Sequence, residues 1–206
     1  MSEIYEVIMT TKPRIAIVIG STRPGRYADK AARWTLKQAQ ARDDIEAELL
    51  DLLDHPLPFF DEKGPLISVP SENAEALRWQ KTLARYDGLV FVVAEYNHSI
   101  TGVLKNALDQ AYKEWGRKPF TAIGYGGTGA SRAVEHLRQI AIALGMVSTA
   151  ASVHIGGADF MSTSPMGANK PIEDIEASLL SATKSALDEL VWWAQATIAA
   201  KAAIAS

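Results

Sequence analysis

Short apolar runs alternate along the chain with segments in which apolar residues recur every three or four positions. The short runs have the length and β-branched content of strands, and they cover 15–19, 45–51, 89–93, 120–125 and 150–154. The segments with helical periodicity cover 29–42, 73–86, 101–115, 131–144 and 173–200. Ser71 is a candidate N-cap for the second helix, and Pro171 stands just before the last helix.

Most of the strand candidates are unbroken apolar runs, which is typical of strands buried on both faces of a sheet. Strands that alternate with helices indicate βαβ units, and therefore an α/β fold with a parallel sheet between two helical layers. No linker or repeat divides the chain, so we expect a single domain over 1–206. Two loops, at 54–70 and 156–171, are long enough to suggest a functional role.

The composition narrows the functional classes. The chain has 48% hydrophobic and 22% charged residues, which are the proportions of a soluble globular protein. Its net charge of −3 gives no electrostatic reason to expect nucleic acid or an anionic membrane as a partner. The absence of cysteine excludes disulfides, thiolate metal sites and cysteine nucleophiles. The N-terminal segment lacks signal-peptide features, and no stretch reaches the ~18 apolar residues that cross a bilayer, so we expect a cytoplasmic protein.

The loop after the first strand, 20–28, has the chemistry of a phosphate-binding loop. In a parallel α/β fold it lies at a helix N-terminus, where backbone N–H groups and the helix dipole favour an anion. Ser21 and Thr22 add hydroxyl groups, and Arg23 and Arg26 add guanidinium groups that suit phosphate.

Three kinds of phosphate loop compete for this segment. Gly20 and Gly25 have the spacing of a P-loop, but Arg26 and Tyr27 replace the Lys and Ser/Thr that such a loop needs for nucleotide and magnesium. Thr22 stands where a dinucleotide-binding GxGxxG loop needs glycine. A loop for the terminal phosphate of a mononucleotide fits best, and the plain alternative is a polar turn.

The loops after the third and fourth strands are also rich in ligand-binding groups. In the strand order 2-1-3-4-5, the loops after strands 1 and 3 flank the crevice in which such sheets bind ligands. The second loop, 95–99, offers an aromatic ring, an amide and backbone donors that suit a flat ring with heteroatoms. The third loop, 125–132, has three glycines that permit close approach of a planar ligand. The simpler interpretations are helix capping by Asn97 and Ser99, a polar surface role for His98 and an ordinary glycine turn.

Four segments together resemble the NADPH-dependent FMN reductase family, which includes flavin, quinone, azo-dye and chromate reductases. They are GSTRPGR at 20–26, PLPFFDE at 56–62, EYNHSITGVLKNALD at 95–109 and YGGTGASRA at 125–133. One departure is Ala94, which stands where the family usually has proline. The resemblance implies a flavodoxin-like three-layer sandwich with a five-stranded sheet in the order 2-1-3-4-5, FMN as cofactor, and NADPH or NADH as co-substrate.

By the same resemblance, residues of all three loops would bind the flavin. The FMN phosphate would be held by Ser21, Arg23, Arg26, Tyr27 and Ala28. The isoalloxazine ring and the ribityl chain would contact Glu95, Tyr96, Asn97, His98 and Ser99. The other side of the ring would be flanked by Tyr125, Gly126 and Gly127. The resemblance implies no catalytic residue and no metal, because N5 of the flavin carries the chemistry.

The resemblance thus predicts an FMN-dependent oxidoreductase that passes electrons from NAD(P)H to a small acceptor, such as a flavin, a quinone, an azo dye or a metal oxyanion. Two alternatives stay open. One is a flavodoxin-type electron carrier that is not an enzyme, and the other is a flavin-free NAD-dependent oxidoreductase that uses Asp51 to bind the ribose.

The segment 57–64 predicts the assembly. It carries Phe59 and Phe60 beside charged residues, and an exposed aromatic pair is costly to leave in water. Leu108 and Tyr112 on a neighbouring helix would continue the contact surface. We expect a homodimer, or a homotetramer built from dimers, in which the partner's aromatic loop completes each flavin site.

Overall fold

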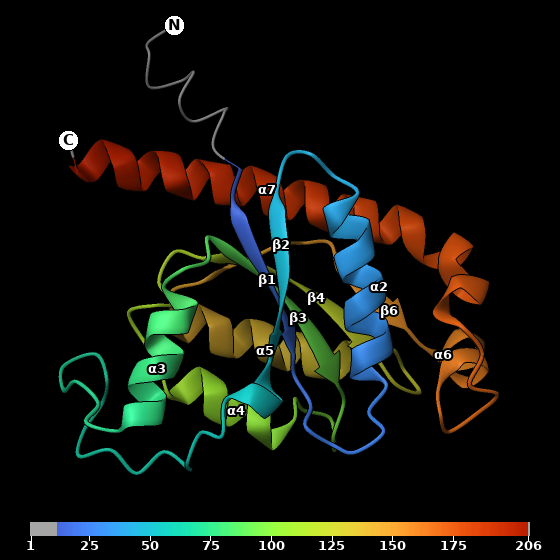
Figure 1. Ribbon diagram of the computed structural model, residues 1–206, viewed down its shortest axis with the longest axis horizontal. Helices are drawn as coiled ribbons and strands as arrows, with labels where there is room; N and C mark the ends of the chain where they lie inside the picture. The colour runs from blue at the N-terminus through green and yellow to red at the C-terminus, as the bar shows by residue number, and fades with distance from the viewer. Residues whose placement is uncertain (1–11, 206) are drawn as a thin grey trace, which may run out of the picture.

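The computed structural model describes residues 12–205, and its centre is a parallel β-sheet (Figure 1). The strands run in the order β2-β1-β3-β4-β5, and β6 also pairs with β4. Their bounds are β1 Arg14–Ile19, β2 Glu46–Asp51, β3 Gly88–Ala94, β4 Pro119–Tyr125, β5 Val147–Ser148 and β6 Val153–Ile155. The predicted α/β class and the predicted order of the strands are confirmed.

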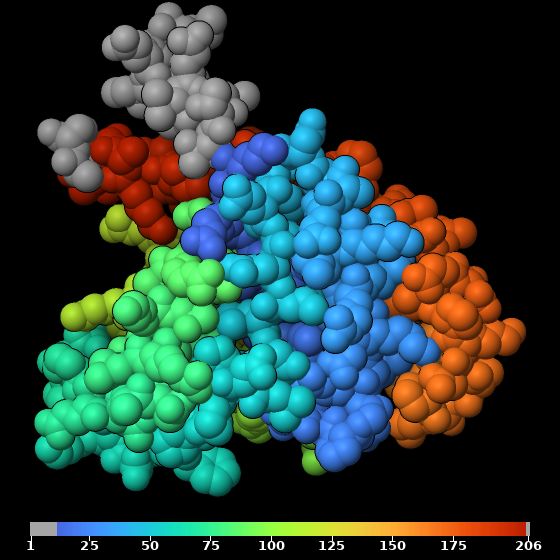
Figure 2. All heavy atoms as spheres, in the orientation of Figure 1, coloured from blue at the N-terminus to red at the C-terminus, as the bar shows by residue number. Residues whose placement is uncertain are grey.

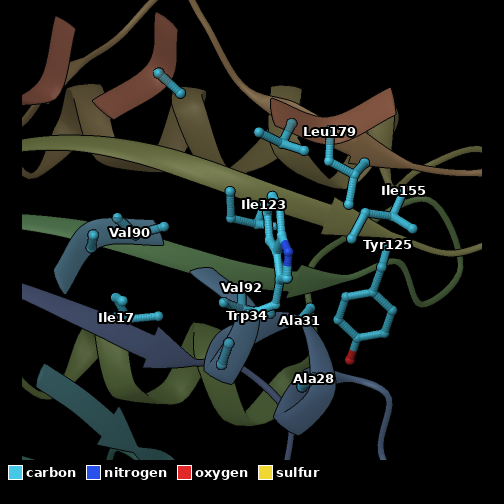
Figure 3. Close-up of a cluster of buried hydrophobic side chains, with 14 of the residues drawn as sticks. Ile17, Ala28, Ala31, Trp34, Val90, Val92, Ile123, Tyr125, Ile155 and Leu179 are labelled. Atoms are coloured by element: carbon cyan, nitrogen blue, oxygen red, sulfur yellow. The ribbon is translucent and has the colours of Figure 1, made fainter. Parts of the chain in front are cut away.

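Helices cover both faces of the sheet, because side chains alternate between the two faces along each strand. Ile15 and Ile17 of β1 face one hydrophobic cluster, whereas Ala16 and Val18 face the other. The first cluster is covered by α2 Ala28–Gln40, α6 Gly157–Thr163 and α7 Glu176–Ala205. The second is covered by α3 Ala74–Leu83, α4 Gly102–Asp109 and α5 Ser131–Ala143. Figure 3 shows the first cluster, in which Trp34 of α2 lies among side chains of the sheet.

The fifth strand differs from the prediction. The expected strand 150–154 is replaced by β5 and β6, which pair with opposite ends of β4. Between them, the carboxylate of Glu189 accepts hydrogen bonds from Ala150 N at 2.9 Å and Ala151 N at 3.0 Å. Arg138 donates to the carbonyl oxygens of Thr149 and Ala150 at 3.2 and 2.9 Å. Two side chains from other elements thus satisfy the backbone groups that a continuous ladder would have used.

Several helix ends also differ. The predicted helix 101–115 ends early, because α4 stops at the C-cap Gln110 and the chain turns so that Trp115 donates its Nε1 proton to Leu108 O. The N-cap of α3 is Asn73 rather than Ser71, since Asn73 Oδ1 accepts from the N–H groups of the first turn. The short helices η1 Leu52–Asp54 and η2 Ile172–Ile175 precede the 54–70 loop and α7, and α6 lies within the loop predicted at 156–171.

The carboxyl ends of β1 and β3 lie very close together, which places their loops side by side. Gly20 N donates to Val92 O at 3.1 Å, and a Cβ atom on Gly20 would lie only 2.7 Å from that oxygen. Thr101 Oγ1 donates to Gly20 O at 2.5 Å and so ties the start of α4 to the end of β1. Among residues 12–205, no helix has the length and apolar content needed to cross a membrane.

Candidate functional site

A cavity of about 410 Å³ opens at the carboxyl ends of the central strands. It is lined by four segments, which follow β1, β3, β4 and β6 along the chain. The lining residues are Ser21, Arg23, Arg26, Tyr27, Ala94, Glu95, Tyr96, Asn97, Tyr125, Gly126, Gly127, Phe160, Ser164, Pro165 and Met166. The structure therefore brings all three predicted loops to one place, at the edge of the sheet where α/β folds bind ligands.

Most of the residues predicted for the flavin line this cavity, and three do not. Ala28 is fully buried in the hydrophobic core and does not line the cavity. His98 is exposed outside the cavity, and Ser99 is engaged elsewhere. The implied ring and ribityl contacts of His98 and Ser99 are therefore not supported by the position of their side chains.

The N-terminus of α2 is open toward the cavity. Tyr27 is its N-cap residue and makes no side-chain cap hydrogen bond. The N–H groups of a first helical turn have no intrahelical partner, and they give this end a partial positive charge. Arg23 is exposed at the cavity wall, and within residues 12–205 its side chain forms no ion pair. This end of the cavity therefore offers donors and a free cation to an anion.

Arg26 departs from the expectation that its guanidinium group serves the phosphate. Its Nε donates to Asp29 at 2.9 Å, and its Nη1 donates to Asp51 at 2.9 Å and to Ser21 O at 2.5 Å. Burial lowers the pKa of Arg26, but the hydrogen bonds with Asp51 and Asp29 outweigh it and raise the pKa above its ordinary value. Most of its donors are thus already used, and Arg26 ties the phosphate loop to the end of β2. The same contacts occupy Asp51, which argues against a ribose-binding role.

The loop after β3 contains a tight turn in a strained conformation. Tyr96 and Ser99 exchange backbone hydrogen bonds of 2.8 and 3.0 Å, and the two residues between them have positive φ angles, 50° at Asn97 and 68° at His98. These are the features of a two-residue type I′ turn. Side chains other than glycine seldom adopt this conformation, and it persists where the surroundings hold it in place. Here Ser99 Oγ lies 2.7 Å from Nδ1 of His136.

Glu95 links the second loop to the third. Arg132 Nε donates to its carboxylate at 2.6 Å, and Ala133 N approaches it at 3.5 Å. Burial raises the pKa of Glu95, but the Arg132 hydrogen bond and the Ala133 N–H more than reverse this and lower it. Because Ala130, the N-cap residue of α5, has no side-chain cap, the Glu95 carboxylate caps that helix from outside. Glu95 therefore fixes the two loops relative to each other.

The backbone of the third loop is bare where it faces the cavity. A Cβ atom on Gly126, whose φ is 142°, or on Gly127 would meet nothing within 4 Å. A side chain here would project into open space that a planar ligand can use instead. Because the cavity is lined both by donors for an anion and by this bare backbone, it fits a phosphorylated ligand with a planar ring, as FMN is.

The fourth wall was missed by sequence reasoning. Phe160, Ser164, Pro165 and Met166 belong to the loop that had been singled out only for its length. The Phe160 ring packs 5.3 Å from the ring of Tyr27, which itself lies 5.2 Å from that of Tyr125. Burial raises the pKa of Tyr125 to about 12, so its hydroxyl keeps its proton and can hydrogen-bond Ser21.

Comparison with known proteins decides the family. Residues 13–159 match the NADPH-dependent FMN reductase family. The chain belongs to this family. Its relatives include an NAD(P)H-dependent FMN reductase of Schizosaccharomyces pombe, 34% identical over 138 residues that make up 66% of this chain and 69% of the relative. Another is an FMN-dependent NADPH-azoreductase of Staphylococcus aureus, 32% identical over 148 residues, which are 70% and 77% of the two chains.

A solved structure of the same fold is the flavoenzyme NAD(P)H:acceptor oxidoreductase FerB from Paracoccus denitrificans. The TM-score is 0.66 at 23% identity, and the match covers 89% of this chain and 97% of FerB. The predicted flavodoxin-like fold and the predicted membership of the reductase family are confirmed. The chain is an FMN-dependent oxidoreductase of this family. Membership of the family favours an enzyme over the alternative of an electron carrier that is not an enzyme.

Proposed function

We propose that this cavity holds FMN and that the protein uses it to pass electrons from NAD(P)H to a small planar acceptor such as a quinone or an azo dye. One observation carries the proposal: a single cavity joins an uncapped helix N-terminus with a free arginine to a bare glycine backbone. When bound, FMN supplies the redox chemistry, because it can take a hydride from the nicotinamide and give two electrons to an acceptor.

The residues divide into those that face the ligand and those that hold the loops. Arg23 and the N–H groups at the start of α2 would bind the phosphate, and the Gly126–Gly127 backbone would support the ring. Arg26 and Glu95 also lie on the cavity wall, but their charges are already paired within the protein. Arg26 is paired with Asp51, and Glu95 is paired with Arg132. Their role would be to keep the phosphate loop and the ring loops in register.

Two measurements test the cofactor. The visible spectrum of the purified protein, or of the protein after reconstitution, should show flavin, and chromatography of the flavin released by denaturation should identify FMN. Finding only FAD, or no flavin, would sink the proposal. Arg23→Ala should weaken FMN binding by ~1.5–3 kcal/mol, the range for a charge-assisted hydrogen bond. Arg33→Ala removes an exposed arginine of α2, the helix that follows the phosphate loop, and should leave the dissociation constant unchanged.

A homodimer with a shared site is the assembly that the 54–70 loop supports. Phe59 is 87% exposed and Phe60 is 39% exposed, yet their backbone is held firmly. Asn106 accepts from Phe60 N at 3.2 Å, and both Asn106 and Gln110 donate to Pro58 O at 2.8 Å. An aromatic pair on an ordered segment loses little entropy when a second copy covers it. Figure 2 shows this segment (cyan to green) at an edge of the molecule.

The proposed contact surface needs one correction. Leu108 of α4 is fully buried, and Tyr112, which lies beyond the end of α4, is half-buried, so these side chains do not extend the surface as expected. Other exposed apolar side chains in the same stretch of the sequence are Leu53 and Ile67, each 55% exposed. Light scattering should give at least twice the chain mass of 22.3 kDa. A monomer with full flavin affinity and full activity would refute the shared site. The cytoplasmic location stays a prediction from the sequence.

A further inference from the structure

The wall formed by Ser164–Met166 is fastened by a lysine in the first turn of α2. Lys30 Nζ donates to Thr163 O at 2.6 Å, to Lys170 O at 2.8 Å and to Asn169 Oδ1 at 3.0 Å. An ammonium group has three N–H donors, and the structure gives an acceptor to each. The Tyr27 hydroxyl adds a fourth link, 2.8 Å from Thr163 Oγ1. In Figure 2 this segment (orange) lies directly against the surface of α2 (blue).

The segment that Lys30 holds is a compact fold of the chain. Gly167, Ala168, Asn169 and Lys170 donate backbone hydrogen bonds back to residues 161–164, at 2.9 to 3.1 Å. A Cβ atom on Gly167 would lie 1.9 Å from Met161 O, so the chain returns onto α6 as closely as a glycine permits. Asn169 has a φ of 50°, a strained value that its contact with Lys30 helps to hold.

Helix stability does not explain a lysine at this position. A positive charge in the first turn opposes the helix dipole, and within residues 12–205 Lys30 has no carboxylate as ion-pair partner. What it does have is a complete set of oxygens from one remote segment. That segment lies beyond residue 159, where the match to the family ends.

The side of the cavity that Lys30 fixes is apolar. Phe160, Pro165 and Met166 line the cavity together with Arg23 of the phosphate loop and Asn97 of the loop after β3. Met166 is 68% exposed and Pro165 is exposed, so both lie at the mouth rather than in the core. A flat apolar ring that enters the mouth would find its van der Waals contacts on this wall.

We propose that Lys30 is a positioning residue which, by fastening residues 163–170, fixes Pro165 and Met166 as the wall against which an aromatic acceptor docks. This inference rests on the proposed function and names the part of the chain that selects apolar ring acceptors over small hydrophilic ones.

The test compares Lys30→Met with Lys37→Met, which removes an exposed lysine from the same helix. In the protein without flavin, K30M should speed amide hydrogen exchange at 167–170 at least tenfold. With saturating FMN and NADPH, it should raise KM for 1,4-naphthoquinone at least fivefold, with kcat unchanged. Turnover of ferricyanide, which needs no ring contact, and the FMN dissociation constant should stay within twofold. K37M should change none of these values.

A double-mutant cycle separates this role from a general loss of structure. Met166→Ala alters only the mouth, and it should also raise KM for the naphthoquinone. If Lys30 acts through the wall, K30M should add little to M166A. Additive effects, unchanged amide exchange, or faster exchange with an unchanged quinone KM would each overturn the inference. A wild-type protein that binds no FMN would instead overturn the proposed function, while the exchange data would still report on the Lys30 contacts.

Discussion

The two long loops of this chain, 54–70 and 156–171, were both predicted from their length, but they expose their aromatic side chains differently. Residues 54–70 are held by Asn106 and Gln110 of α4, and they leave Phe59 in solvent. The loop predicted at 156–171 is held by Lys30 of α2, and it places Phe160 against the cavity with 8% of its surface exposed. The two loops also differ in the remote part of the chain that supplies the anchoring side chains. One loop thus leaves an aromatic group in solvent, where the proposed second copy would cover it, and the other places one at the cavity that we propose for the flavin.

The largest expected effect comes from replacing one phenylalanine of each loop, Phe160 or Phe59, with alanine. Phe160→Ala removes a ring packed on Tyr27, and we expect the free energy of unfolding of the apo protein to fall by ~2–4 kcal/mol. Phe59→Ala removes an exposed ring and should change the stability of the monomer by less than ~0.5 kcal/mol. Urea titrations at a concentration that favours the monomer would measure both. Equal losses would erase the distinction between the loops.

Acid should lower the stability of the folded chain through His55, at the start of the 54–70 loop. Burial, together with the nearby charge of Arg78, lowers the pKa of His55. Between that lowered value and the ordinary 6.5, the unfolded chain binds a proton that the folded chain does not. Stability is therefore lost as the pH falls below 6.5, at no more than ~1.4 kcal/mol per pH unit for this group. His55→Gln should reduce that slope in denaturation curves between pH 5 and 7, and an unchanged slope would contradict the assignment.

Alkali should lower the stability of the folded chain through Tyr27, whose hydroxyl contacts Thr163 in the 156–171 loop. Burial raises the pKa of Tyr27, the hydrogen bond with Thr163 opposes this, and the charge of Asp159 adds to it. Above pH 10 the unfolded chain releases the phenolic proton first, so stability falls as the pH rises further. Tyr27→Phe should remove part of this loss and leave the part due to Tyr86 and Tyr125, whose pKa values burial raises to about 12. A variant with the full alkaline loss would show that Tyr27 does not contribute.

The smallest effect concerns protein concentration. If a second copy covers the first loop, amide exchange near Phe59 and Phe60 should slow severalfold as the concentration rises through the dimer dissociation constant. Exchange at 167–170 depends on contacts within the chain, so it should not change. Mass spectrometry can measure amide exchange in peptides from both segments in the same series of samples. The peptide that covers 167–170 then serves as the internal control for the peptide that contains Phe59 and Phe60.

The apolar runs were sufficient to predict the sheet, and the loop motifs were sufficient to predict most of the cavity. The fifth strand was misplaced because side chains of two other helices, Arg138 of α5 and Glu189 of α7, bind its backbone groups, and the pattern of the strand itself does not reveal them. Ser99 and His98 fell outside the cavity because a left-handed turn redirects them, and residue types alone do not reveal that turn. Ser164–Met166 was missed because its position depends on Lys30, more than a hundred residues earlier in the chain.

The break between β5 and β6 has a consequence for how this protein behaves at high concentration. An unpaired strand at the border of a sheet offers a row of N–H and C=O groups on which another chain can build, and this is a common start of aggregation. Here the Glu189 carboxylate covers the N–H groups of Ala150 and Ala151, and Arg138 covers the carbonyl groups beside them. A charge of each sign thus occupies these backbone groups, so this part of the border offers a second chain fewer groups with which to extend the sheet.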